Sequence, residues 1–161
     1  MLELHTTKKV GPDVPENRQR VGCYKNRKAV IDGMETCLES IGIVRALIEG
    51  LEAEGFIDDR VVLDRCAINL HVVGNQIGML DPQLQFNDAM RTAYDVRSVI
   101  AHQYGTGSFS KSTFWRNIND DLDYLEQGCR QVIRTIASEE VRFISPNRKP
   151  RRPRAFVIRN R

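Results

Sequence analysis

The sequence has no long apolar run, only three histidines and few aromatic side chains among its 161 residues. No apolar stretch approaches the roughly 20 residues that a membrane-spanning helix needs. We therefore expect no transmembrane segment and no membrane partner. The first twenty residues, MLELHTTKKVGPDVPENRQR, have no apolar core of the kind found in a secretory signal. This pattern predicts a cytoplasmic protein.

Cysteine is also scarce, and none of the four cysteines forms a C-x-x-C pair. Closely spaced cysteines are typical of zinc sites and of the disulfide frameworks of secreted domains. Cys37, Cys66 and Cys129 instead fall on apolar stripes of predicted helices, so we expect buried free thiols. The acidic run at 120–123 lies on one helix and predicts a solvated face. We expect no metal site and no cofactor.

Acidic residues are missing from one end of the chain. Residues 142–161 contain eight Lys or Arg and no Asp or Glu, while the other 141 residues hold 16 basic and 21 acidic side chains. A basic tail on an acidic body is either a solvated end or a segment that contacts RNA phosphates or an acidic partner. The candidate RNA-binding residues are Arg148, Lys149, Arg151, Arg152 and Arg154.

Apolar residues recur at steps of three and four through most of the remaining chain, which is typical of amphipathic helices. We predict one helix over about 24–55 ended by Gly55, and a second that begins at Asp58 or Asp59 and stops at Asp81-Pro82. A third begins near Asn87 and reaches the turn at 105–108. A fourth opens at Ser110 or Ser112 and carries its apolar stripe to Ile136.

With no strand pattern in the body, we expect an all-α fold, an antiparallel bundle of four to five helices with short connections. The predicted organisation is a polar leader over residues 1–24, a helical domain over 25–137 and an irregular basic tail over 138–161.

The stretch RSVIAHQYG, residues 97–105, carries an arginine, a histidine and a tyrosine near a predicted helix end. At 100° per residue, Arg97 and Tyr104 are about 20° apart and share a face, whereas Arg97 and His102 are about 140° apart. Ser98 and His102 are four residues apart and also share a face. Arg97 and His102 converge only if the helix frays near Ala101, or if a second chain supplies its own copy.

These residue types suit RNA cleavage. The reaction needs a base for the 2′-hydroxyl, an acid for the leaving 5′-oxygen and a cation on the phosphate. Histidine, with a pKa of about 6.5, suits both proton transfers, and arginine is a forked phosphate ligand. A two-fold dimer would bring two histidines and two arginines together. From spacing alone, the same pattern also fits a histidine that complements a helix C-terminus.

The motif R-x4-H-x-Y, followed by a glycine turn and a helix opening with Trp115, resembles the HepT-like toxins of the HEPN superfamily. These are the ribonuclease halves of HepT–MntA toxin–antitoxin pairs. The segment LHVVGNQIGML at 70–80 is similar to the family's L-x-x-I-G-E-A pattern. The segment FWRNINDDLDYL at 114–125 is similar to its W-x-x-I-x-x-D-L-x-x-L helix. The resemblance covers roughly residues 28–137.

The resemblance implies an all-helical homodimer in which Arg97 and His102 are the catalytic residues. Ser98 would orient the histidine. Tyr104 would help shape the pocket and accept AMP from an MntA-like nucleotidyltransferase antitoxin, which would place negative charge beside Arg97. Two positions depart from the family pattern, Ser98 in place of Asn and Asn75 in place of Glu, and each change predicts weaker turnover.

The expected function is therefore a metal-independent endoribonuclease toxin that cleaves RNA through 2′-hydroxyl attack at a composite dimer site. One alternative is a catalytically inactive HEPN protein that binds nucleotide, RNA or a nucleotidyltransferase partner. Another is a helical scaffold in which RSVIAHQYG is only a helix end.

Overall fold

The computed structural model describes Tyr24 and residues 26–138. Residues 1–23, 25 and 139–161 lie outside this part, and with them the predicted leader except Tyr24, Cys23 and the candidate RNA-binding residues of the basic tail. The described residues form five α-helices and one 3-10 turn, with no strand. The elements are α1 Arg27–Ile48, α2 Ala53–Asp58, α3 Arg60–Gly78, η1 Pro82–Leu84, α4 Asp88–Gln103 and α5 Lys111–Ala137. The predicted all-α fold class is confirmed.

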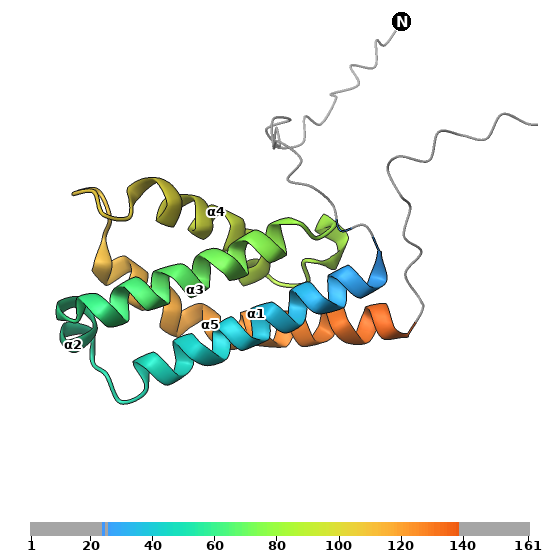
Figure 1. Cartoon of the computed structure of the whole chain (residues 1–161), viewed down its shortest axis with the longest axis horizontal. Helices are drawn as coiled ribbons and strands as arrows, with labels where there is room; N and C mark the ends of the chain where they lie inside the picture. The colour runs from blue at the N-terminus through green and yellow to red at the C-terminus, as the bar shows by residue number, and fades with distance from the viewer. Residues whose placement is uncertain (1–23, 25, 139–161) are drawn as a thin grey trace, which may run out of the picture.

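The helices form an antiparallel bundle in which α3 occupies the middle (Figure 1). Its main contacts are with α1 on one side and α4 on the other, and α1 in turn packs on α5. The short α2 lies near the start of α3 and contacts both α3 and α5. Contact between α4 and α5 is much less extensive than contact between α4 and α3. One flank of α4 is therefore loosely packed.

The core is built from the apolar stripes of the long helices, as the three- and four-residue spacing predicts. On α5, every stripe residue from Ile118 to Ile136 is buried. The cysteines Cys37, Cys66 and Cys129 are free and buried, which confirms their predicted state. Burying such side chains supplies most of the stability of a helical bundle.

Three predicted helix starts are confirmed by capping hydrogen bonds. The Asp59 carboxylate accepts from the amides of Val61 and Val62. Asn87 caps α4 by accepting from Met90 at 3.0 Å. Ser110, rather than Ser112, caps α5. A polar side chain at this position satisfies amides that have no partner within the helix.

The prediction of one continuous helix over about 24–55 is wrong. Helix α1 ends at Ile48, and Gly50 follows with a φ of +73°, a left-handed conformation that favours glycine. The chain then forms α2, which contains Gly55 and buries Phe56 against the bundle. The apolar stripe continues through this turn to Leu51, so periodicity alone does not reveal the break.

Glycines allow α4 to lie close to both of its neighbours. A Cβ atom at Gly74 of α3 would overlap Arg97 and the Ala93 carbonyl oxygen. Gly128 of α5 accommodates Met90 in the same way. These close approaches set the position of α4 and therefore the place at which the 97–105 segment meets α3.

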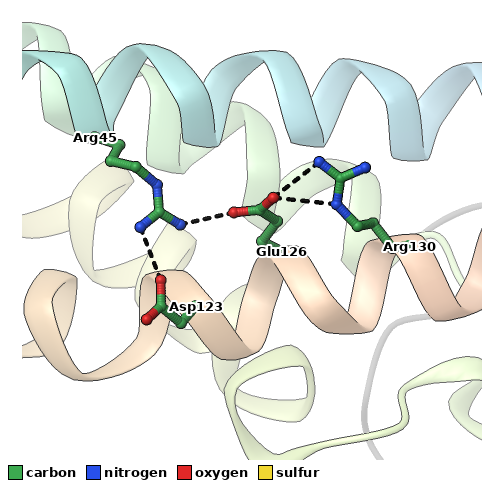
Figure 2. A network of polar contacts seen from close by, with 4 residues as sticks. All are labelled: Arg45, Asp123, Glu126 and Arg130. Atoms are coloured by element: carbon green, nitrogen blue, oxygen red, sulfur yellow. Dashed lines mark hydrogen bonds and ion pairs between the residues drawn. The ribbon is translucent and has the colours of Figure 1, made fainter.

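A surface network of ion pairs joins α1 to α5 (Figure 2). Arg45 of α1 contacts Asp123 at 2.8 Å and Glu126 at 2.7 Å. Arg130 binds the same Glu126 carboxylate at 2.9 Å. Glu126 is thus shared by an arginine from each helix.

Candidate functional site

The motif occupies the C-terminal half of α4, where the helix stays regular to Gln103. The Tyr104 amide donates to the Ile100 carbonyl oxygen at 3.1 Å, and Gly105 ends the helix with a φ of +86°. The helix does not fray near Ala101, which was one of the two ways in which Arg97 and His102 could converge, because its hydrogen bonds continue through this residue. A single chain therefore does not bring Arg97 and His102 together by unwinding.

Arg97 is partly buried on the side of α4 that faces α3. Its Nε donates to the Asn75 Oδ1 atom at 2.6 Å. Its guanidinium carbon lies 5.5 Å from the centre of the Tyr94 ring, a cation–π distance. Among the described residues, the two terminal nitrogens of Arg97 have no hydrogen-bond partner, so its fork is oriented and still able to bind an anion.

Asn75, which sequence comparison with the HepT pattern marks as a departure, is the residue that holds this arginine. An amide oxygen accepts the hydrogen bond without adding negative charge. The positive charge of Arg97 is therefore not neutralised by the residue at position 75 and is available to a ligand. A carboxylate at position 75 would form an ion pair with it.

His102 is exposed, and within the described part of the chain nothing hydrogen-bonds to its ring. It lies in the last turn of α4, the end of the helix that carries the partial negative charge of the helix dipole. The expected contact from Ser98 to His102 is not formed. The Ser98 hydroxyl instead donates to the Tyr94 carbonyl oxygen at 3.0 Å, a local bond that serine commonly makes inside helices.

Tyr104 faces α3, as does Arg97, in agreement with the predicted common face. Its hydroxyl donates to the Asp64 carboxylate, and Arg60 Nε lies 3.3 Å from the same carboxylate oxygen. The ring packs edge-on against Phe109 at 5.1 Å. Burial, and next the hydrogen bond to Asp64, raise the pKa of Tyr104 to about 12, while the bond from Tyr104 lowers the pKa of Asp64.

Arg60 and Asp64 were not singled out by sequence reasoning. The only local signal is their i,i+4 spacing at the start of α3, which is common on helix surfaces. Their position beside Tyr104 depends on how α3 and α4 align, which no local pattern specifies.

The alignment also corrects the expectation that AMP on Tyr104 would place its charge beside Arg97. Tyr104 meets α3 at Asp64 and Arg97 meets it at Asn75. These positions are eleven residues apart, or about 16 Å along a helix that rises 1.5 Å per residue. The phosphate on a modified Tyr104 would therefore lie near Arg60 and Asp64.

A narrow apolar slot separates α4 from α5 next to the motif. It is lined by side chains such as Ala93, Val96 and Phe114, with Asn117 and Asp121 on the α5 side. Its volume of about 30 Å³ holds one or two waters, not a nucleotide.

The other polar and aromatic residues that could belong to a functional site lie in contacts that support the fold. Asp121 is partly buried, and this burial, with Asp120 next to it, raises its pKa. Asp123 is in the Arg45 network, and His71 is partly buried. The Trp115 ring packs on Phe56 of α2, with ring centres 4.8 Å apart. Among the described residues, no group of three or more His, Cys, Asp or Glu is placed to hold a metal ion.

No helix in the described part of the chain is long and apolar enough to cross a membrane. Comparisons of the chain with protein-family models, with curated proteins and with solved structures find no match. The class that the fold defines is an all-α helical bundle. Its candidate site is the Arg97–Tyr104 segment together with the α3 residues that hold it.

Proposed function

We propose that the chain is a HepT-like, metal-independent endoribonuclease toxin that acts as a homodimer. One observation carries the proposal: a single helix end presents an exposed His102 and an arginine whose guanidinium is oriented by Asn75 with its fork unoccupied. The R-x4-H-x-Y resemblance supplies the reaction class.

In the proposed reaction, the RNA 2′-oxygen attacks the adjacent phosphorus and the bond to the 5′-oxygen breaks. One histidine takes the 2′-hydroxyl proton and another gives a proton to the departing 5′-oxygen. The products are a 2′,3′-cyclic phosphate and a 5′-hydroxyl. Arg97 stabilises the charge on the phosphate oxygens.

Two chains are required because each provides one histidine in the motif, and because Arg97 and His102 lie on different faces of α4. A C2 interface formed by the α4 and α5 region would place two motif copies across one cleft. The exposed position of His102 supports this arrangement.

Tyr104 is the proposed control point, modified by an MntA-like nucleotidyltransferase antitoxin. Its hydroxyl oxygen would attack the α-phosphorus of ATP, forming a phosphodiester and releasing pyrophosphate. The tyrosine proton would pass to the Asp64 carboxylate, which already accepts its hydrogen bond. The product carries AMP on the tyrosine oxygen.

The test is RNA cleavage by the purified full chain in EDTA, beside His102→Ala and Arg97→Ala. We expect cleavage with cyclic phosphate ends in the wild type, and a loss of at least about a hundredfold in each variant. Asp95→Asn, an exposed change on the same helix, is the matched control and should cleave normally. Equal cleavage by wild type and His102→Ala would contradict the assignment and indicate a contaminating nuclease.

A second candidate function is a non-catalytic HEPN protein that binds RNA, nucleotide or a nucleotidyltransferase. The observation that favours it is that Ser98 bonds to its own helix and leaves His102 unoriented. It predicts RNA binding without cleavage by wild-type protein that mass spectrometry shows to carry no AMP on Tyr104.

A further inference from the structure

The C-terminal end of α4 is held to its surroundings by few contacts. Its N-terminal half rests on close glycine approaches to both α3 and α5, at Gly78 and Gly128. Farther along, the slot between α4 and α5 leaves the α5 side loosely packed. The contacts near the end itself include buried Ile100, the Tyr104 ring on Phe109, and the hydrogen bond from Tyr104 to Asp64.

This hydrogen bond joins the last turn of α4 to α3, and Arg97, seven residues earlier, makes a second polar contact with α3 at Asn75. Asp64 lies in the second turn of α3 and receives both the Tyr104 hydroxyl and the Arg60 guanidinium on one carboxylate oxygen. The side chain of His102, two residues before Tyr104, makes no hydrogen bond with the described residues. The position of His102 therefore depends on the α4 backbone and on the contacts of its neighbours Ile100 and Tyr104.

We propose that Asp64 is a positioning residue. Its hydrogen bond from Tyr104, which we call the latch, attaches Tyr104 to α3 and thereby fixes the helix end that carries His102. The latch breaks when a group is added to the Tyr104 oxygen. The catalytic part of this inference rests on the proposed ribonuclease function, whereas the latch itself does not.

Two physical effects would open the latch in a modified chain. A substituted tyrosine oxygen has no proton, so it has nothing to donate to Asp64. A phosphodiester also carries negative charge, which the Asp64 carboxylate repels at short range. Arg60 is the nearby cation that would bind the phosphate in place of Asp64. Inactivation would then follow from displacement of the helix end, without any contact to Arg97.

Hydrogen–deuterium exchange of the full chain tests the latch directly. In Asp64→Ala and Tyr104→Phe, we expect the amides of residues 100–106 to exchange about fivefold faster than in the wild type. The double variant should be no faster than either single variant, because both remove the same contact. Asp64→Asn keeps an acceptor oxygen and should restore most of the protection.

The controls are Arg60→Ala, which removes the ion pair but leaves the tyrosine bond, and Tyr94→Phe, which removes a hydroxyl without a described partner. Both should exchange as the wild type does. Unchanged exchange in Asp64→Ala, or an equal increase in Arg60→Ala, would overturn the latch.

RNA cleavage separates the two proposals. If the ribonuclease assignment holds, Asp64→Ala should lower kcat about tenfold with little change in KM, since the arginine clamp is intact. If the wild type does not cleave RNA, the proposed function fails, and the exchange experiment still decides whether the latch exists. A rise in KM alone would show that Asp64 acts on RNA binding and would contradict a positioning role.

Discussion

At the scale of single residues, Asn75 is the contact on which the proposed chemistry depends most. Replacing it with Ala removes the hydrogen bond that orients the Arg97 guanidinium. We expect Asn75→Ala to lower RNA cleavage about tenfold, because a misplaced clamp loses transition-state contacts. The measurement is kcat/KM beside Asn69→Ala, whose amide bonds only to its own helix. Normal cleavage in Asn75→Ala would show that Arg97 needs no support.

Asp121 offers a residue-scale test of stability. Its raised pKa means that the ionised carboxylate is less favourable in the fold than in the unfolded chain. The destabilisation is complete above the raised pKa and disappears as pH falls toward the ordinary value of about 3.9. We expect Asp121→Asn to raise Tm at pH 7 by roughly 1–2 °C. The gain should shrink as the pH is lowered through that interval. A lower Tm at pH 7 for Asp121→Asn than for the wild type would contradict the destabilising effect of this carboxylate.

Much of the residue-scale arrangement follows from helical geometry. A rotation of 100° per residue predicts that Arg97 and Tyr104 share a face and that His102 lies elsewhere, and the structure agrees. The partners, Asn75 and Asp64, could not be predicted in this way. They depend on long-range alignment of α3 and α4, which arises from glycine contacts and core packing rather than from local spacing.

At the scale of elements, α4 depends on the small size of its neighbours. We expect Gly74→Ala to destabilise the fold by about 1–3 kcal/mol, because the new methyl group would push against Arg97 and the α4 backbone. Denaturant unfolding measures the change. Gly42→Ala is the matched control: this glycine is exposed within α1 and a Cβ there meets nothing within 4 Å. Gly42→Ala should raise the free energy of unfolding by up to about 1 kcal/mol. Equal effects of the two changes would contradict the close approach.

The surface ion pairs of Arg45 should make a small, salt-dependent contribution to the free energy of unfolding, because they join α1 to α5. Because the ion pairs are largely exposed, Arg45→Ala should lower the free energy of unfolding by no more than about 1 kcal/mol. Most of this difference should disappear in 1 M NaCl, where the Debye length is about 3 Å. A loss that is unchanged in salt would indicate that the arginine stem, rather than its charge, supports the packing (Figure 2).

The elements also show where sequence patterns suffice. Side chains that can cap a helix mark the starts of α3, α4 and α5, and these are confirmed. The break after Ile48 was missed because two glycines, Gly50 and Gly55, each could end α1. In the structure the chain turns at Gly50, and Phe56 is buried in α2.

At the scale of the whole molecule, the proposed composite site makes mixed dimers informative. A tenfold excess of His102→Ala would draw wild-type chains into mixed dimers with one motif histidine. If both histidines are needed, we expect RNA cleavage to fall about tenfold after subunit exchange. An equal excess of Asp95→Asn should not lower cleavage. Unchanged cleavage with the His102→Ala excess would mean that each chain carries a complete site.

The two ends of the helical unit lie side by side. Arg27, the first residue of α1, donates from Nη1 to the Ile136 carbonyl oxygen at 3.3 Å, near the end of α5. Neighbouring ends of this kind permit circular permutation, in which a short linker joins them and the chain is opened elsewhere. The exposed turn at 105–107 is a suitable opening, because a cut there leaves each of the five α-helices whole. Such a permutant would keep the bundle while giving the Tyr104 segment a free end.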